Sequence, residues 1–171
     1  MDGDIDGNPA LSDPRLDGVD HDVVTHGPVS SLEEAALARG VTPAAIVKTM
    51  VVRLSDDEYV FVLVPGDRVI DWGKLRSELG VNRISLPDEA AAKGVTGYAR
   101  GTITPFGSTA DLRVYADSRL ASGRISIGGG AKGVSISIDG NVALEILDAV
   151  VADVTKPAQP IEPGGRGEER R

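Results

Sequence analysis

Three features of the sequence could together bind and polarise an ester or a phosphate. Lys48 is a single cation inside the apolar run of residues 44–52. The segments Gly101–Gly107 and Gly128–Gly133 are rich in glycine and carry little charge. Glycine lets the main chain approach a ligand closely, and the proline within the first segment fixes the shape of the turn. These residue types indicate a site built from backbone amides and one cation.

Lys48 is predicted to lie on a β-strand with apolar residues on both faces. Strand alternation places it on the same face as Ile46, Met50 and Val52. Partial burial lowers the pKa of a lysine, and the ammonium is then a good hydrogen-bond donor to an ester or phosphate oxygen. The alternative is an edge lysine whose ammonium reaches water along the surface.

The two glycine-rich segments each allow a functional and a structural interpretation. Gly101–Gly107 could present backbone donors that hold a substrate and stabilise an oxyanion, or it could simply connect a helix to a strand. Gly128–Gly133 could form an anion-binding nest to which Lys132 adds charge, or a flexible hairpin loop. His26 precedes a Gly-Pro turn and fits either a polar contact at the mouth of the site or a solvated turn residue.

Several common catalytic arrangements are missing from the sequence. The chain has two histidines, His21 and His26, and no cysteine. It contains no Gly-x-Ser-x-Gly elbow, no phosphate-binding P-loop motif and no cluster with metal-ligand spacing. These absences disfavour the usual covalent and metal-dependent hydrolases, and we expect neither a metal nor a cofactor.

The composition is that of a single globular domain. The chain has 171 residues, of which 41% are hydrophobic and only 4% aromatic, so the core must consist mainly of Val, Ile, Leu and Ala. No apolar run approaches the roughly 18 residues of a membrane span. The N-terminus lacks the basic and apolar pattern of a signal peptide, so we expect a cytoplasmic protein.

The negative charge is concentrated at the N-terminus. The formal net charge is −8, and residues 1–23 contain seven aspartates against Arg15 alone. Residues 24–155 carry a net charge of only −3. Bulk electrostatic binding of nucleic acid needs many Lys and Arg contacts to phosphates, so a nucleic-acid ligand would have to be held locally.

The chain is predicted to consist of one folded domain between two tails. Residues 1–22 are rich in Asp, Gly and Pro without periodicity, which predicts a disordered acidic N-terminal tail. Residues 156–171 predict a disordered C-terminal tail for similar reasons. The folded domain is expected to cover residues 23–155.

Helix and strand patterns alternate within the domain and predict an α+β fold. Helices are expected after Ser30 or Ser31, at Thr42-Pro43, and over residues 71–79, 88–93 and 142–147. Strands are expected over residues 48–54, 59–64, 112–115, 124–127, 134–138 and 150–154, with a short one near 83–85. Strands of the second half follow one another closely, which predicts a mixed but largely antiparallel sheet of six to seven strands with flanking helices.

Several of the segments above occur in an order typical of one family. The order is His26-Gly-Pro, Ile46-Val47-Lys48-Thr49, Val64-Pro65-Gly66-Asp67-Arg68, Thr96-Gly97-Tyr98, Gly101-x-x-x-Pro105-Phe106-Gly107 and Gly129-Gly130-Ala131-Lys132-Gly133. In this order the chain resembles the YbaK/ProX-like aminoacyl-tRNA deacylases over about residues 24–153. These are the free-standing relatives of the editing domain of bacterial prolyl-tRNA synthetase. The spacing of Lys-Thr and Gly-x-x-x-Pro-Phe-Gly is the most specific part of the resemblance.

The resemblance implies a barrel-like sheet and the hydrolysis of the ester of a mischarged tRNA, with Cys- or Ala-tRNA(Pro) as favoured substrates. It assigns the catalytic roles to Lys48 and Gly101. It implies no protein nucleophile, because water or a group of the substrate attacks the carbonyl. It implies that the protein binds the acceptor 3′ end of an aminoacylated tRNA and that prolyl-tRNA synthetase could be a partner. It implies no association with a membrane. The substrate-binding residues that it implies are His26, Thr49, Tyr98, Thr102, Ile103, Pro105, Phe106, Gly128, Gly129, Gly130 and Lys132. The alternative function is a non-catalytic module that binds tRNA ends or a synthetase.

Overall fold

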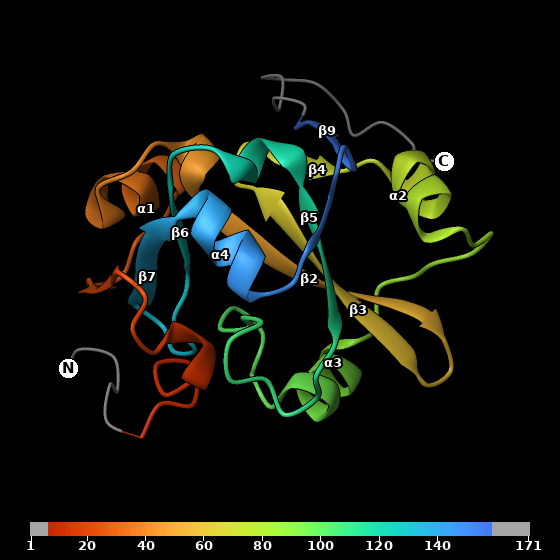
Figure 1. Cartoon of the computed structure of the whole chain (residues 1–171), viewed down its shortest axis with the longest axis horizontal. Coiled ribbons are helices and arrows are strands. Elements are labelled where there is room, and N and C mark those ends of the chain that lie inside the picture. Colours follow the sequence, from red (N-terminus) through yellow and green to blue (C-terminus); the bar gives the residue numbers. More distant parts are fainter. Residues whose placement is uncertain (1–6, 159–171) are drawn as a thin grey trace.

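The computed structural model describes residues 7–158 and has an α+β fold (Figure 1). The four α-helices in this range are α1 (Leu32–Arg39), α2 (Trp72–Leu79), α3 (Glu89–Thr96) and α4 (Gly140–Ile146). The strands are β1 (His21–Thr25), β2 (Val47–Ser55), β3 (Glu58–Pro65), β4 (Arg68–Ile70), β5 (Arg113–Asp117), β6 (Arg124–Gly128), β7 (Val134–Asp139), β8 (Val150–Ala152) and β9 (Thr155–Pro157). Three 3₁₀ turns are η1 (Pro14–Leu16), η2 (Pro43–Ala45) and η3 (Ser118–Ala121).

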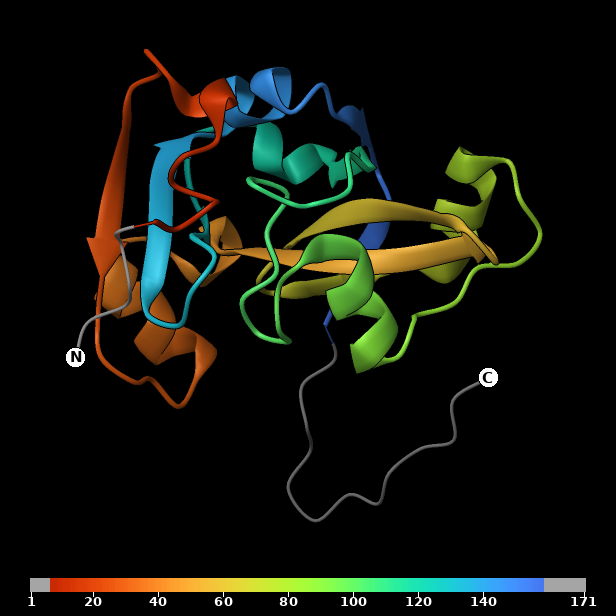
Figure 2. The same cartoon turned by 90° about the horizontal axis from the view of Figure 1, so that it is seen from below.

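The described strands form three sheets, with the orders β1-β7-β6, β2-β3-β5-β8 and β4-β9. The prediction of a single barrel-like sheet is therefore wrong: no closed barrel forms within residues 7–158, although the pairing is mixed and mostly antiparallel. One parallel bridge, between Ile46 and Ser126, joins the start of β2 to β6. Figure 2 shows the two larger sheets turned strongly against one another, with β2 and β3 extending away from the sheet of β1, β6 and β7.

The hairpin of β2 and β3 separates two hydrophobic clusters, because alternate residues of β2 face opposite sides. Val47 and Val51 pack into the larger cluster, which also contains residues of β5, β6, β7 and α4. Met50 and Val52 pack into the smaller cluster beneath α2 and β4. The predicted alternation around Lys48 is thus confirmed, and successive residues of β2 serve two different environments.

The aspartate caps of α2 and α3 are as expected, but two helices have other bounds: α3 continues to Thr96 instead of ending at residue 93, and α4 begins at Gly140, after the cap Asp139, instead of at residue 142. Asp71 and Asp88 cap α2 and α3, since their carboxylates accept from the amides of Lys74 and Ala91. Of the two serines expected to precede α1, Ser31 is the cap: its hydroxyl accepts from the Glu34 amide, while the Glu34 carboxylate accepts from the amide of Ser30. The short helix expected at Thr42-Pro43 is the 3₁₀ turn η2.

The prediction that residues 1–22 form a disordered tail is wrong for residues 7–22. Ala10 and Leu16 are almost completely buried and belong to the larger hydrophobic cluster. Residues 14–16 form η1, and β1 pairs with β7 from His21 onward. The composition misled the prediction because a few specific contacts fix this segment in spite of its acidity. Residues 1–6 lie outside the described range.

Three short strands, β1, β4 and β9, were missed because each depends on a distant partner. No strand was expected at the position of β4, and β9 extends into the predicted C-terminal tail, yet the two pair in register. The predicted tail is therefore wrong for Lys156 and Pro157, while residues 159–171 lie outside the described range. Near residues 83–85 only a bridge between Ser85 and Arg53 forms. Within the described residues no helix is long and apolar enough to cross a membrane.

Candidate functional site

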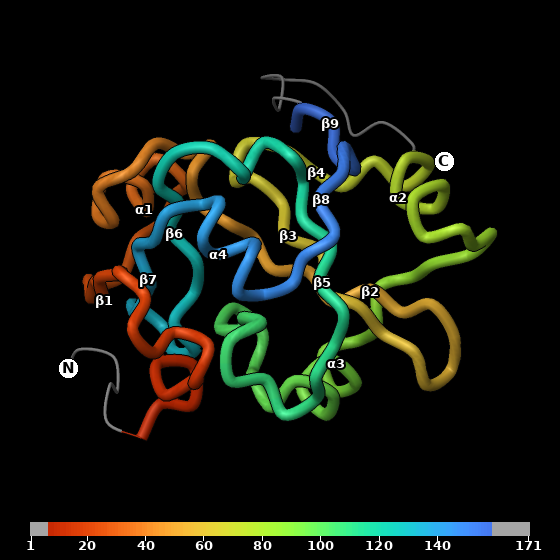
Figure 3. Tube along the Cα trace, viewed as in Figure 1, coloured from red at the N-terminus to blue at the C-terminus, as the bar shows by residue number. Residues whose placement is uncertain are grey.

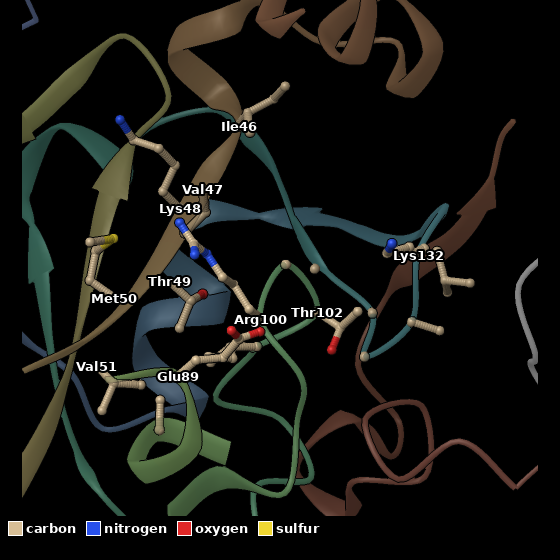
Figure 4. Close-up of a pocket in the computed structure, with 18 of the residues that line it drawn as sticks. Ile46, Val47, Lys48, Thr49, Met50, Val51, Glu89, Arg100, Thr102 and Lys132 are labelled. Atoms are coloured by element: carbon tan, nitrogen blue, oxygen red, sulfur yellow. The ribbon is translucent and has the colours of Figure 1, made fainter. Parts of the chain in front are cut away.

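A pocket of about 710 Å³ lies between β2, the start of α3 and two loops, and Figure 4 shows it in close-up. One loop contains residues 100–103 and the other is the β6–β7 loop, of which residues 128–134 line the pocket. The remaining lining residues come from α1, β2 and the entry to α3: Arg39, residues 46–51 and residues 86–89, with Ala92. This volume lies within the usual range for a pocket that binds a small molecule, roughly 300–1,000 Å³.

β2 meets the pocket with its edge. Its pairing on this side stops at the Ile46–Ser126 bridge and resumes only at the Arg53–Ser85 bridge. Among the described residues no strand pairs with β2 between these bridges, which explains why six consecutive residues line the pocket despite their alternation. An open strand edge presents backbone N–H and C=O groups that can bind a ligand.

Most of the residues that the sequence singled out lie around this one pocket. Those that line it are Lys48, Thr49, Gly101, Thr102, Ile103, Gly128, Gly129, Gly130 and Lys132. Four others do not line it: His26, Tyr98, Pro105 and Phe106. The structure thus brings together residues more than 80 positions apart, while their roles toward a ligand stay predictions.

The Lys48 ammonium is turned toward β4, where it donates a hydrogen bond to the carbonyl of Arg68 at 2.5 Å. Burial lowers the pKa of Lys48, and the nearby carboxylate of Asp67 offsets this only in part. A lysine ammonium has three N–H donors, so two remain for a ligand that approaches the β2 edge. Lys48 is therefore partly desolvated, as the apolar run predicted, but it is anchored by a backbone carbonyl.

Thr49 points to the opposite face of β2 from Lys48, together with Val47 and Val51 (Figure 4). Its hydroxyl oxygen is buried and has no hydrogen-bond partner. An unpaired buried hydroxyl is costly, so a hydrogen bond to this atom would be favourable if a polar group reached it.

The loop around Gly101 has a shape that requires glycine. Gly101 has a φ of 87°, in the left-handed region, and a Cβ placed there would meet nothing within 4 Å. The next residue closes a turn, because both the amide and the hydroxyl of Thr102 donate to the carbonyl of Ala99, at 3.0 and 2.7 Å. The Thr102 hydroxyl is therefore already committed, and the open space lies beside Gly101.

Tyr98, Pro105 and Phe106 are buried behind the loop rather than exposed to the pocket. The Tyr98 hydroxyl donates to the carbonyl of Phe106 at 2.6 Å, which ties the two ends of the loop together. Burial, with a further contribution from the charge of Asp13, raises the pKa of Tyr98 to about 12. In this structure these three residues shape the loop and do not face the pocket.

The β6–β7 loop is held by tight backbone contacts. The amide of Gly129 donates to the carbonyl of Val134 at 2.9 Å, and a Cβ at Gly129 would lie 2.7 Å from a methyl carbon of Val134. His26 supports the same loop from outside, because its amide donates to the carbonyl of Gly133 at 2.9 Å. Lys132 at the loop tip is exposed.

Four charged residues of the pocket were not predicted as site residues: Arg39, Asp88, Glu89 and Arg100. Figure 4 shows Arg100 extending toward the part of β2 that carries Lys48, with Glu89 beside it. Arg39, the last residue of α1, looked in the sequence like an ordinary C-terminal helix charge. No local signal distinguishes these residues, because they reach the pocket only through the folding of distant segments.

Arg39 is the least exposed of these charged residues. Its Nη1 donates to the Ser126 hydroxyl at 3.4 Å, which is long for a hydrogen bond, and its Nε is buried without a partner. Burial lowers the pKa of Arg39, and no ion pair offsets this among the residues that the structure describes. A desolvated guanidinium without a carboxylate partner is well suited to bind an anionic ligand.

The pocket is cationic although the protein is acidic. Its lining contains four basic side chains (Arg39, Lys48, Arg100 and Lys132) and two acidic ones (Asp88 and Glu89), whereas the whole chain has a net charge of −8. The carboxylate of Asp88 is already engaged by the Ala91 amide. Within residues 7–158 no group of three or more His, Asp or Glu side chains is placed to hold a metal.

The chain is similar to known proteins in sequence and in structure. The family profile of the aminoacyl-tRNA editing domain matches residues 26–146. Proline–tRNA ligase of Desulforamulus reducens is 30% identical over 142 residues, which cover 83% of this chain and 25% of the relative. Proline–tRNA ligase 1 of Streptomyces avermitilis is 32% identical over 153 residues, which cover 84% of this chain and 27% of the relative.

A solved structure, described as a candidate trans-editing enzyme for prolyl tRNA synthetase, has a TM-score of 0.73 and 25% identity. That match covers 80% of this chain and 87% of the other. By contrast, the chain spans only about a quarter of the length of the two ligases. The family profile covers most of the described domain, including β2 and both pocket loops. This chain belongs to the aminoacyl-tRNA editing domain family, the YbaK/ProX family related to the editing domain of prolyl-tRNA synthetase.

Proposed function

We propose that this protein is a trans-acting deacylase that hydrolyses the ester of a mischarged tRNA, with Cys- or Ala-tRNA(Pro) as favoured substrates. Family membership supports an aminoacyl-tRNA substrate and hydrolase chemistry. The observation that carries the proposal is the cationic pocket in an otherwise acidic protein. Bulk charge would repel a tRNA, so the attraction has to come from the pocket itself.

The proposed reaction needs positioning and polarisation more than a protein nucleophile. Among residues 7–158, the pocket lining contains no serine, cysteine or histidine, and its hydroxyl groups belong to Thr49 and Thr102. We assign the attack on the ester carbonyl to water or to a group of the substrate. Backbone amides near Gly101 would stabilise the developing oxyanion, and Lys48 would hold the terminal nucleotide. The unpaired hydroxyl of Thr49 could bind a polar group of the amino acid.

Incubation of the protein with Cys-, Ala-, Ser- and Thr-tRNA(Pro) tests this proposal, with Pro-tRNA(Pro) as the correctly charged control. We expect Cys- or Ala-tRNA(Pro) to lose its ester well above the buffer rate, while the control stays charged. The assay is repeated with prolyl-tRNA synthetase present, since a partner could supply tRNA affinity. If no ester is cleared faster than in buffer under either condition, the deacylase proposal fails. Tight binding of the same tRNAs would then support a non-catalytic module.

Arg39 should contribute to substrate binding by holding a phosphate of the tRNA end. We expect Arg39→Met to raise KM by roughly tenfold, the value of one hydrogen bond to a charged group, with little change in kcat. The dependence of log(kcat/KM) on log salt should become less steep by about 0.7 per lost phosphate contact. The variant should be no less stable in urea unfolding, because it removes a desolvated charge.

The matched control is Arg83→Met, since Arg83 is exposed and does not line the pocket. This change should leave both KM and the salt dependence as in the wild type. A wild-type KM for Arg39→Met would show that Arg39 does not touch the substrate.

A further inference from the structure

We propose that residues 8–16 form a clasp that holds the two pocket loops at a fixed spacing. Figure 3 shows this N-terminal segment, in red, beside the β6–β7 loop and the loop that precedes β5. The clasp makes Asn8, Asp13 and Arg15 positioning residues for the site. The proposal rests on the proposed function in one respect: it takes these loops to bind the aminoacyl end of the tRNA.

One end of the clasp binds the Gly101–Gly107 segment through a buried carboxylate. Asp13 is only 6% exposed, and its Oδ2 accepts from the amide of Gly107 at 2.8 Å. The same oxygen accepts from Nη2 of Arg15 at 2.7 Å, and this guanidinium donates onward to the carbonyl of Pro105 at 3.0 Å. Asp13 and Arg15 therefore bind a backbone donor and a backbone acceptor two residues apart, the Gly107 amide and the Pro105 carbonyl. The Arg15 guanidinium also lies 5.7 Å from the centre of the Phe106 ring.

The other end of the clasp binds the β6–β7 loop. Nδ2 of Asn8 donates to the carbonyl of Gly129 at 2.7 Å. Gly130 packs so closely that a Cβ there would lie 2.8 Å from Oδ1 of Asn8 and 2.9 Å from Cβ of Ala10. Asn8 itself is held, since its Oδ1 accepts from the amide of Ala10 at 2.9 Å. This loop therefore rests directly on the N-terminal segment.

The clasp is short and internally bonded, so it can transmit the position of one loop to the other. The amide of Ser12 donates to the carbonyl of Asn8, and that of Asp13 donates to the carbonyl of Ala10. The side chains of Ala10 and Leu16 anchor it in the hydrophobic cluster. A bonded turn with two apolar anchors has few alternative conformations.

The charge of Asp13 is what makes the clasp effective. Burial alone would raise the pKa of Asp13, but the hydrogen bonds from Arg15 and from the Gly107 amide outweigh it and hold the pKa below its ordinary value. The carboxylate is therefore ionised at neutral pH and can accept from both donors. The other oxygen, Oδ1, accepts from the amide and from Nε of Arg15. An amide in place of the carboxylate would turn an N–H group toward the donors on one of the two oxygens and lose those bonds.

The spacing of the two loops matters because a small displacement of a group that positions the substrate lowers the rate of catalysis. A misplacement of about 1 Å in a positioning group can reduce turnover by roughly 10²-fold. Residues 101–103 and 128–130 lie close together, since a Cβ at Gly128 would lie 3.6 Å from the carbonyl oxygen of Ile103, but no strand pairing between them fixes their spacing. The clasp supplies a link that would keep their backbone groups at the spacing that the ligand requires.

The test compares Asp13→Asn with Asp20→Asn, a matched change of an exposed aspartate that makes no contact with the loops. Hydrogen exchange of backbone amides is measured by NMR, together with kcat/KM for the tRNA that the wild type clears best. In Asp13→Asn we expect the amide of Gly107 to exchange at least about tenfold faster, because a bond to a charged group is lost. The amide of Gly129 should follow, while those of β2 and β3 stay protected. The value of kcat/KM should fall by about tenfold, and Asp20→Asn should match the wild type.

The response of Gly129 distinguishes a clasp from a local contact, because Asp13 does not touch this residue. If the amide of Gly129 exchanges in Asp13→Asn at the wild-type rate, the clasp is overturned. The positioning role is also overturned if the amides of both loops exchange faster while kcat/KM stays at the wild-type value. Circular dichroism at the assay temperature must show the variant folded; if it unfolds, Arg15→Met is used with the same expectations. If the wild type clears no ester, the proposed function fails, but the linked exchange of Gly107 and Gly129 still decides whether the clasp exists.

Discussion

Lys48→Met is expected to lose turnover of the aminoacyl ester by on the order of 10²–10³-fold, the usual effect of removing one preorganised electrostatic group. Methionine keeps much of the apolar stem and removes the ammonium that could hold the substrate. The structure indicates that stability should change little. Burial disfavours the charged lysine, so the variant gains back a desolvation cost while losing the hydrogen bond to the Arg68 carbonyl. The measurements are single-turnover deacylation and urea unfolding.

The pH dependence gives a second readout for the same residue. Because burial lowers the pKa of Lys48, its charged form is lost at a lower pH than that of an exposed lysine. Enzyme-dependent turnover, after subtraction of base hydrolysis in buffer, should therefore decline as pH rises through this lowered pKa. Lys48→Arg should retain part of the activity and lose that decline, since arginine stays charged.

Lys93→Met is the control, because Lys93 is exposed on α3 and does not line the pocket. It should behave as the wild type in both assays. Wild-type turnover in Lys48→Met would remove Lys48 from the mechanism even if the protein is a deacylase. A large loss of stability would instead point to a structural role for its bond to Arg68.

Gly101→Val should reduce turnover by about 10²-fold while the protein still folds. A Cβ at Gly101 meets no atom within 4 Å, so the side chain finds space, but that space lies at the pocket. A β-branched residue also resists a φ of 87° and would push the loop toward a different backbone conformation. Both effects displace the amides that we assign to the ester carbonyl.

Gly123→Val is the control that separates the effect of backbone strain from the effect of the position of Gly101 at the pocket. Gly123 has a φ of 74° and equally open surroundings, but it lies outside the pocket lining. Both variants should lose about 1–2 kcal/mol of unfolding free energy in urea, the cost of a left-handed conformation. Only Gly101→Val should lose turnover. Equal turnover in the two variants would remove the Gly101 loop from the site.

Local chemistry predicted most of the elements but not how they associate. The strand alternation around Lys48 and the caps at Asp71 and Asp88 depend on near neighbours in sequence, and the structure confirms them. The prediction of a single sheet was wrong, because strand patterns say nothing about which edges pair, and the barrel-like shape that the resemblance implied does not close. β4 and β9 show the same limit, since neither is a strand without the other.

The N-terminal segment was misread for a related reason. Its acidic, Asp- and Pro-rich composition predicts too little apolar surface to order a chain. Order in residues 7–22 comes instead from a few contacts to distant groups. Asn8 binds Gly129 across 121 sequence positions, and the Gly107 amide binds Asp13 across 94. Composition averages over a segment and cannot register such contacts.

The sequence by itself determined the family motifs, the desolvated environment of Lys48 and the need for glycine at position 101, because each depends on local conformation or on immediate neighbours. Only the tertiary structure decided that Arg39 and Arg100 reach the same pocket, that Tyr98 and Phe106 lie behind it, and that β2 meets it edge-on. Burial, charge compensation and edge exposure are set by groups far away in the chain. They become defined only once the sheets and loops are in place.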